Sequence, residues 1–300
     1  MNAKPIIVIH AGALFDREEH DASHEKEIRD TLSKSLRKGF DILSKDGSSL
    51  DAVEEAVVIL ENSGWFDAGR GSVFTNAGTQ ELDAAIMEGK KRRAGAIGAV
   101  QRVKNPIKGA RIIMDKSKHV FMVGQGAEEA IKKLGGEMVE PSYFYSEREW
   151  QYYQDLIKKG KNYWHHGTVG AVALDRNGNL AAATSTGGLE LKHPGRLGDS
   201  PVIGAGTYAE NGVIAVSCTG SGEYFLRSVS AFKAAAQIKY GHIPPSDALN
   251  AVIDEIEEMG GKAGLIAIDH EGNAYMPYNS VGMYRGKMMS SMKIPEIGIF

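Results

Sequence analysis

One short segment constrains the possible folds of this chain more than any other. It comprises residues 167–186, which read GTVGAVALDRNGNLAAATST. Two apolar stretches, 168–174 and 180–186, flank the turn sequence RNGN, and an Asn-Gly turn between apolar runs is typical of a β-hairpin. A similar arrangement returns at 263–280, AGLIAIDHEGNAYMPYNS. Strands with so few charged residues are expected to lie inside a molecule, covered by other elements.

Amphipathic helices are expected on both sides of these hairpins. Apolar residues at helical spacing predict a helix over 28–43, and Ser48 followed by Asp51 resembles a capping box at the start of a second helix. Further helices are expected from Asn105-Pro106 to Met114, over 223–240 and from Ser246. Strands flanked by a helix pair in each half predict a layered α/β sandwich, with sheets inside and helices outside.

Composition narrows the classes of function. The net charge of −3 and the absence of a long basic block argue against nucleic acid or an anionic membrane as a partner. A single cysteine, Cys218, allows no internal disulfide and fits a reducing compartment. The apolar run at 6–9 is too short for a signal peptide, and no stretch is long enough to span a membrane. We expect a cytoplasmic protein.

Two glycine-rich segments resemble known motifs in residue type but not in the structural context that those motifs require. Residues 204–209, GAGTYA, match a dinucleotide-binding fingerprint, but the segment that follows reads as a turn and a strand instead of the required helix. Residues 217–223, SCTGSGE, resemble a nucleophile elbow but carry Thr219 at the position of the serine. What remains is a set of hydroxyls and glycines, with Arg196 and Asp199 between them.

The Gly167-Thr168 step has two readings. Threonine is common in strands, and this is the simpler one. Alternatively, the chain is cut there, because a threonine hydroxyl needs an adjacent base to become a good nucleophile. A cut before Thr168 would free an α-amine with a pKa of about 7.7–8, which would place base and nucleophile on one residue. Gly167 suits such a cut, because no Cβ obstructs approach to its carbonyl.

Several motifs in one order extend this second reading. GTVGAVALD, ATSTGG, GRLGDSPVIGAGTYA and SCTGSGE resemble the plant-type L-asparaginase/isoaspartyl peptidase group of N-terminal-nucleophile threonine hydrolases, as do FDAGRGSV, ELDAAIM and GARIIM in the first half. The resemblance covers nearly the whole chain and is weakest over 130–165. It implies an αββα fold, self-cleavage between Gly167 and Thr168, and release of L-aspartate from L-asparagine and from β-aspartyl dipeptides through an ester on Thr168.

The resemblance also implies a role for each site residue. Thr168 would be the nucleophile and, through its free amine, the base, and Thr186 would tune its hydroxyl. Thr219 and Gly220 would form the oxyanion hole. The substrate would be held by the residues Arg196 (α-carboxylate), Asp199 and the Gly222 carbonyl (α-ammonium), together with Thr219 and Gly220.

A structural sodium ion and an oligomer belong to the same resemblance, whereas no cofactor is expected for catalysis. The implied sodium ligands are backbone carbonyls of residues in LENSGWFDAGR, namely Leu60, Ser63, Phe66, Ala68 and Arg70. The chain would be one domain, 1–300, made as a precursor. The cut would give an α piece (1–167, with a flexible linker at about 146–167) and a β piece (168–300), assembled as a dimer of αβ heterodimers.

Two residues depart from the pattern of that group. The usual His-Gly-Gly reads His10-Ala11-Gly12 here, so Ala11 replaces the first glycine. If this position requires a positive φ, alanine would cost about 1–2 kcal/mol of conformational free energy. Asp67 stands where an asparagine is usual, and a carboxylate near the nucleophile would raise the pKa of the Thr168 amine. Both departures bear on the rate and pH dependence of cleavage.

Three alternatives stay open at this point. The chain could be a glycosylasparaginase, although one cysteine and the missing signal peptide argue against that class. It could be a threonine endopeptidase of the same fold. It could also be a non-cleaving amino-acid-binding protein that uses Arg196 and Asp199 without cutting itself.

Overall fold

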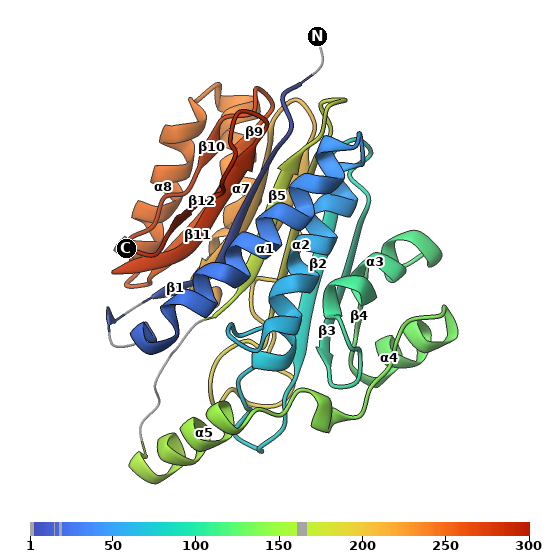
Figure 1. Ribbon diagram of the computed structural model, residues 1–300, viewed down its shortest axis with the longest axis vertical. Helices are drawn as coiled ribbons and strands as arrows, with labels where there is room; N and C mark the ends of the chain where they lie inside the picture. The colour runs from blue at the N-terminus through green and yellow to red at the C-terminus, as the bar shows by residue number, and fades with distance from the viewer. Residues whose placement is uncertain (1–2, 15, 18–19, 161–166) are drawn as a thin grey trace.

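Two β-sheets are stacked between two layers of helices (Figure 1). The computed structural model describes residues 3–14, 16–17, 20–160 and 167–300. The larger sheet has eight strands in the order β12-β11-β1-β5-β6-β2-β3-β4, and the smaller has four in the order β10-β9-β8-β7. Helices α1, α2 and α3 cover the larger sheet, whereas α7 and α8 cover the smaller one. The predicted α/β sandwich is confirmed.

The elements have the following bounds. The strands are β1 (Ile6–Leu14), β2 (Leu82–Glu88), β3 (Ala94–Val100), β4 (Phe121–Val123), β5 (Val169–Leu174), β6 (Leu180–Thr186), β7 (Thr207–Glu210), β8 (Ile214–Gly220), β9 (Ala263–Asp269), β10 (Ala274–Tyr275), β11 (Gly282–Met289) and β12 (Glu296–Gly298). The helices are α1 (Glu25–Ser44), α2 (Ser49–Ser63), α3 (Pro106–Lys116), α4 (Gly124–Lys133), α5 (Glu147–Lys159), α6 (Gly222–Ser228), α7 (Ser230–Gly241) and α8 (Pro245–Glu258).

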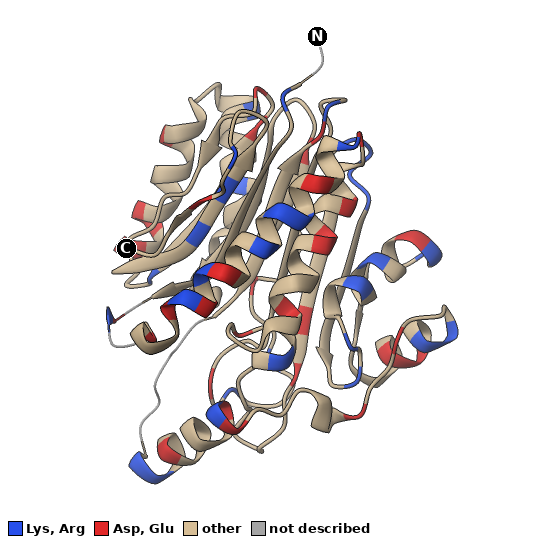
Figure 2. Ribbon diagram, viewed as in Figure 1, with Lys and Arg blue, Asp and Glu red and all other residues tan. Residues whose placement is uncertain are grey.

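Successive side chains of a strand point to opposite faces of the sheet, so the strands of the larger sheet contribute to two hydrophobic cores. In β1, Ile7 and Ile9 belong to the core shared with α1 and α2, whereas Ile6 and Val8 belong to the core shared with the smaller sheet. All four are buried, which explains why the strand reads as continuously apolar instead of alternating. Charged residues gather on the outer helices and loops (Figure 2). Within the described residues, no helix combines the length and apolar character needed to cross a membrane.

Helix boundaries follow local chemistry. The Ser48 hydroxyl oxygen accepts a hydrogen bond from the Asp51 amide (3.1 Å), and the same hydroxyl donates to Asp51 Oδ2 (2.7 Å). This reciprocal pair is the predicted cap of α2, and it satisfies an amide that has no partner inside the helix. Gly64 ends α2 with a φ of 76°. The predicted helix after Asn105-Pro106 is also present, as α3.

The expected linker at 146–167 is wrong over its first part. Ser146 caps α5 by accepting from the Glu149 amide (3.2 Å), and Trp150 packs against Phe74 with ring centroids 5.2 Å apart. Trp150 also stacks on Tyr153 (5.1 Å). The physical reason is that this polar segment forms an amphipathic helix. Its aromatic face packs against the body of the protein, and its polar face stays in water. Residues 161–166 lie outside the described residues.

The single helix expected over 223–240 is two helices. Val229 has a φ of 49° and separates α6 from α7. An L-residue in the left-handed region breaks the i to i−4 ladder, so the apolar spacing continues although the helix does not.

The order of strands interleaves the two halves of the chain. β5, which follows Thr168, lies between β1 and β6, and β6 pairs with β2. Residues 1–167 and 168–300 therefore share one sheet and its cores.

Candidate active site

Strand pairing places the Gly167-Thr168 step beside Thr186. In the β5–β6 hairpin, Gly170 is paired with Thr184 and Val169 with Ser185, so the next position brings Thr168 to Thr186. Thr168 is only 7% exposed. The two threonines are thus brought together by the register of a hairpin that the sequence predicts.

Three hydrogen bonds connect these residues. The Thr168 hydroxyl donates to Thr186 Oγ1 (3.2 Å), and the Thr186 hydroxyl donates to the Gly167 carbonyl (3.0 Å). The Gly188 amide donates to Thr186 Oγ1 (2.9 Å). Thr186 therefore contacts both the hydroxyl of Thr168 and the carbonyl that precedes it, as a group that polarises both would have to do.

A buried polar network lies behind this pair, between the two sheets. His10 Nε2 is hydrogen-bonded to Ser217 Oγ (2.9 Å), and Ser217 Oγ to Thr184 Oγ1 (2.8 Å). Thr207 Oγ1 continues the network to Thr184 Oγ1 (2.6 Å). Burial lowers the pKa of His10 to about 3, against an opposing contribution from the Thr168 backbone, so its imidazole is neutral. The network fixes the sheets relative to each other at the site.

The network leaves no space for a side chain at one position of β5. A Cβ added to Gly170 would clash with both Ser217 Oγ and His10 Nε2. The glycine that follows the Thr168-Val169 step is therefore required by the hydrogen bond that joins the sheets.

Thr219 lies at the same edge of the sandwich as Thr168. Its methyl group is next to Gly264, whose other close neighbours are Met283 Sδ and Tyr278 Cβ. Met283 pairs with Ala13, at the end of β1 that is level with the start of β5. Thr219 Oγ1 is buried and has no hydrogen-bond partner among the described residues. A buried hydroxyl of this kind is available to a bound group.

Arg196, Asp199 and Gly222 form one cluster. A Cβ added to Gly222 would lie 2.7 Å from Asp199 Oδ1 and 3.1 Å from an Arg196 terminal nitrogen. Arg196 makes a bidentate ion pair with Glu223, with Nε donating to Oε1 (2.9 Å) and the terminal nitrogen to Oε2 (2.8 Å). The guanidinium fork to which the family resemblance assigns a substrate carboxylate thus already holds a carboxylate of this chain.

Asp199 is buried, and one of its oxygens, Oδ2, has no hydrogen-bond partner among the described residues. Burial raises the pKa of Asp199 to about 7, and the nearby Arg196 guanidinium opposes that rise. A buried acceptor next to an arginine is suited to an ammonium–carboxylate pair. Among the described residues, no hydrogen bond or ion pair joins Asp199 or Arg196 to Thr168.

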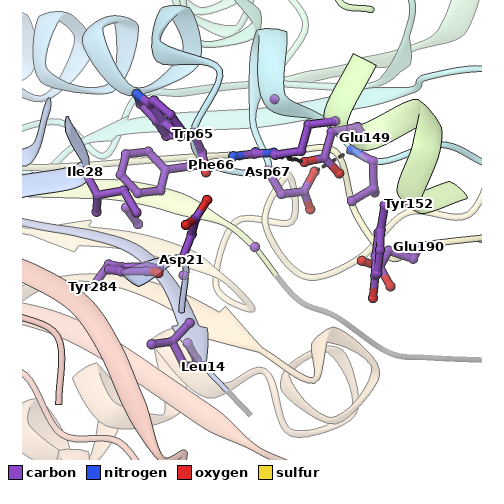
Figure 3. A pocket seen from close by; sticks show the side chains of 17 residues that line it. Leu14, Asp21, Ile28, Trp65, Phe66, Asp67, Glu149, Tyr152, Glu190 and Tyr284 are labelled. Carbon is purple, nitrogen blue, oxygen red and sulfur yellow. Dashed lines mark hydrogen bonds and ion pairs between the residues drawn. The ribbon is translucent and has the colours of Figure 1, made fainter. Parts of the chain in front are cut away.

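Asp67 lies against the junction. A Cβ added to Gly167 would clash with Asp67 Cβ, and a Cβ added to Gly187 would clash with Asp67 Oδ1. The Asp67 carbonyl also accepts from the Gly187 amide (3.1 Å). Asp67 and Gly167 line a cavity of about 320 Å³ together with Glu149 and Glu190 (Figure 3). The departure at Asp67 therefore falls directly beside the predicted cleavage site.

The strain expected at Ala11 does not arise. Ala11 is not among the described non-glycine residues with positive φ, and it pairs with Val169 as an ordinary strand residue. Gly12, which follows it, takes a φ of 111°. The left-handed conformation needed at this turn is thus supplied by glycine, at a position one residue later than the sequence reading assumed.

The predicted sodium ligands span the last turn of α2, which carries Leu60 and Ser63, and the turns that follow it, which carry Phe66, Ala68 and Arg70. The Leu60 carbonyl accepts from the Ser63 hydroxyl (2.8 Å), and the Phe66 carbonyl from the Ala68 amide (2.7 Å). Ala68 and Phe66 are buried, whereas Arg70 is exposed. Carbonyl oxygens have a second lone pair, so these backbone atoms fit a hard cation chemically. The sodium site stays a prediction.

Glu61 is a site residue that the sequence reading missed. Its fully buried carboxylate accepts from the Ser185 hydroxyl (2.7 Å), the Asn105 side chain (2.9 Å) and the Ile107 amide (2.9 Å). Burial raises its pKa to about 7. The signal was present, because Glu61 follows Val57 by four residues and so lies on the apolar face of α2. His10 had a similar signal, as a polar residue at the end of a buried run.

Comparison with known proteins agrees with this geometry. The asparaginase family model matches residues 3–299. An isoaspartyl peptidase of Escherichia coli is 44% identical over 295 residues, which cover 94% of this chain and 92% of that protein. An isoaspartyl peptidase/L-asparaginase of Mus musculus is 39% identical, with 97% and 91% covered, and a plant-type L-asparaginase of Pyrobaculum calidifontis is 39% identical, with 93% and 95% covered.

The clash at Gly170 gives a test of the network between the sheets. Gly170→Ala should lower the free energy of unfolding by about 1–3 kcal/mol, because the new methyl group separates His10 from Ser217. Gly126→Ala in α4 is the matched control, since nothing lies near its added Cβ, and it should raise stability by about 0.5–1 kcal/mol. Urea unfolding measures both. Equal stability of the two variants would contradict the close packing at Gly170.

Proposed function

Since this chain belongs to the asparaginase family, we propose that it hydrolyses the side-chain amide of L-asparagine and the β-aspartyl bond of isoaspartyl dipeptides. The single observation that carries the proposal is the hydrogen-bonded set formed by Thr168, Thr186 and the Gly167 carbonyl. Names of relatives over more than nine-tenths of the chain support the reaction class.

The first proposed step is self-cleavage. Thr168 Oγ attacks the Gly167 carbonyl carbon, and negative charge develops on the Gly167 oxygen. The Thr186 hydroxyl, 3.0 Å from that oxygen, stabilises the charge. The C–N bond then breaks while the proton lost by the Thr168 hydroxyl is transferred to the Thr168 nitrogen, which leaves Gly167 as an ester on Thr168 Oγ. Water hydrolyses the ester and gives a Gly167 carboxylate and a free Thr168 hydroxyl and amine.

Turnover uses the same hydroxyl on a substrate. The free amine of Thr168 accepts the hydroxyl proton as Oγ attacks the amide carbon of the substrate side chain. The unpartnered Thr219 hydroxyl and the adjacent Gly220 amide are the proposed donors to the oxyanion. Ammonia or an amine leaves with a proton, and water then releases L-aspartate from the ester. No metal takes part in these steps.

Substrate selection is proposed to rest on Arg196 and Asp199. The guanidinium fork would bind the α-carboxylate, and the Asp199 carboxylate, with the Gly222 carbonyl, would bind the α-ammonium. Glu223 occupies the fork in this structure, so a substrate carboxylate would replace one ion pair with another. Because of this exchange, Arg196 contributes less to the free energy of substrate binding than an unpaired arginine would.

The remaining features of the prediction are proposed with this function. Residues 1–167 and 168–300 would stay together after the cut, because β5 pairs with β1 and β6 with β2, which supports one interleaved domain. A dimer of αβ heterodimers, a cytoplasmic location and a structural sodium ion on the Leu60, Ser63, Phe66, Ala68 and Arg70 carbonyls follow from the family resemblance. The ion would stiffen the loop that carries Asp67.

Removal of the nucleophile tests the assignment. Thr168→Ala should abolish both self-cleavage and hydrolysis, because it removes the hydroxyl that follows the Gly167 carbonyl in the chain and is hydrogen-bonded to Thr186. Thr168→Ser keeps the hydroxyl and should retain both. Gel electrophoresis follows the cut, and ammonia release from asparagine follows turnover. Hydrolysis of asparagine by Thr168→Ala protein would refute the assignment of the nucleophile.

Loss of the guanidinium should act mainly on substrate binding. Arg196→Ala should raise KM for asparagine by roughly tenfold to a thousandfold, equivalent to about 1.4–4 kcal/mol, because the substrate carboxylate loses a charge-assisted partner. Arg227→Ala is the control, because Arg227 lies on α6 one turn after Glu223 and stacks on Tyr224 instead. An unchanged KM in Arg196→Ala protein would discard the proposed orientation of the substrate.

A further inference from the structure

A β-bulge lies in the larger sheet next to Thr186. The pairing of β2 with β3 shifts by one residue at Asp83, so Gly98 and Ala99 of β3 oppose a single residue of β2. Ala99 takes a φ of 50°, a left-handed conformation that costs an alanine free energy. The Asp83 carboxylate holds it, because Oδ1 accepts from the Ala99 amide (2.7 Å). Asp83 is paired with Thr186 on its other side, and bulges beside active sites commonly redirect side chains.

Lys192 is the buried cation that faces Asp83. The Lys192 side chain is 1% exposed and that of Asp83 is fully buried. Lys192 Nζ lies 3.8 Å from Asp83 Oδ2 and donates to the Glu81 carbonyl (3.0 Å). Asp83 Oδ2 makes no hydrogen bond to any described residue, so its partner is the lysine charge. Replacing a buried ion pair with apolar side chains of similar volume is often neutral or stabilising, so stability alone does not explain two buried charges here.

The Lys192 side chain also packs on the turn that follows Thr186. A Cβ added to Gly188 would lie 2.8 Å from Lys192 Nζ and 2.9 Å from its Cδ. Gly188 has a φ of 93°, which glycine adopts without strain. Its amide donates to Thr186 Oγ1 (2.9 Å), and Thr186 is hydrogen-bonded to Thr168. The lysine therefore supports, from behind, the residue whose amide orients the Thr186 hydroxyl.

The same pair reaches the loop 187–200 on both sides of Arg196. Lys192 precedes Arg196 by four residues and ties this part of the loop to β2. Leu197, which follows Arg196, packs on the bulge, since a Cβ added to Gly98 would lie 2.7 Å from Leu197 Cδ2. The bulge is in turn held by Asp83. Both segments that flank Arg196 thus depend on one buried ion pair.

We propose that Lys192 and Asp83 are positioning residues, whose buried ion pair fixes Thr186 and the loop that carries Arg196 relative to each other. The inference rests on the proposed function. Loss of the pair should lower kcat and slow self-cleavage through Thr186, and it should raise KM through Arg196, because small displacements of positioned groups cost large factors in rate. A pair that only stabilised the fold would leave these constants unchanged in protein that remains folded.

The test removes both charges at once. The double variant Lys192→Met with Asp83→Asn leaves no unpaired buried charge, so it should stay folded, as urea unfolding checks. Its kcat/KM for asparagine, per cleaved chain counted by intact mass, should fall by about tenfold to a hundredfold, with both kcat and KM changed and with slower self-cleavage. Lys233→Met with Glu255→Gln is the matched control, because it removes a half-exposed ion pair between α7 and α8 (2.6 Å) and should keep wild-type kinetics.

Wild-type kcat, KM and cleavage rate in the folded double variant would overturn the inference. Asp83→Asn alone keeps the test decisive if the double variant does not fold. Its amide oxygen can still accept from the Ala99 amide, but Lys192 loses its charged partner, so kcat and KM should change in the same directions by smaller factors. Unchanged constants in this variant would equally overturn the inference. Wild-type protein that neither cuts itself nor hydrolyses asparagine would instead refute the proposed function.

Discussion

The hydrogen bonds of Thr186 to Thr168 and to the Gly167 carbonyl are the interaction on which the rest of the site depends. They exist because β5 and β6 form a hairpin in a fixed register, and a slip of one residue would turn Thr186 to the other face of the sheet. The register is held from both sides, since β5 also pairs with β1, and β6 with β2. The wide apolar sandwich therefore serves to fix one hydroxyl beside one peptide bond.

Much of the fold could be predicted because local chemistry and global packing agree. Buried strands such as β1 read as apolar runs, and Ser48 with Asp51 marks the start of α2. The two incorrect predictions, of a linker at 146–167 and of a single helix over 223–240, have a common cause. Helix α5 depends on Trp150 meeting Phe74, and the break at Val229 depends on a left-handed residue that apolar spacing does not report. Contacts between segments distant in the sequence decide both.

The contacts of the candidate site likewise include some that the sequence predicts and some that it does not. Proximity of Thr168 to Thr186 follows from hairpin pairing and was predictable, whereas the link from His10 across the sheets to Ser217 requires the stacked arrangement. The pairing of Arg196 with Glu223 is a contact between a loop and a helix, and no spacing rule gives it. Asp67 was recognised as a departure, but only the structure shows that it packs against Gly167.

We propose that this protein breaks its own chain at one bond, between Gly167 and Thr168. The most direct measurement is the intact mass of the purified protein, taken fresh and after prolonged incubation, with the N-terminal residues of any fragment identified. The account predicts two fragments, 1–167 and 168–300, whose masses sum to that of the chain plus one water, with the second fragment beginning at Thr168. A single unchanged mass of the 300-residue chain would contradict it.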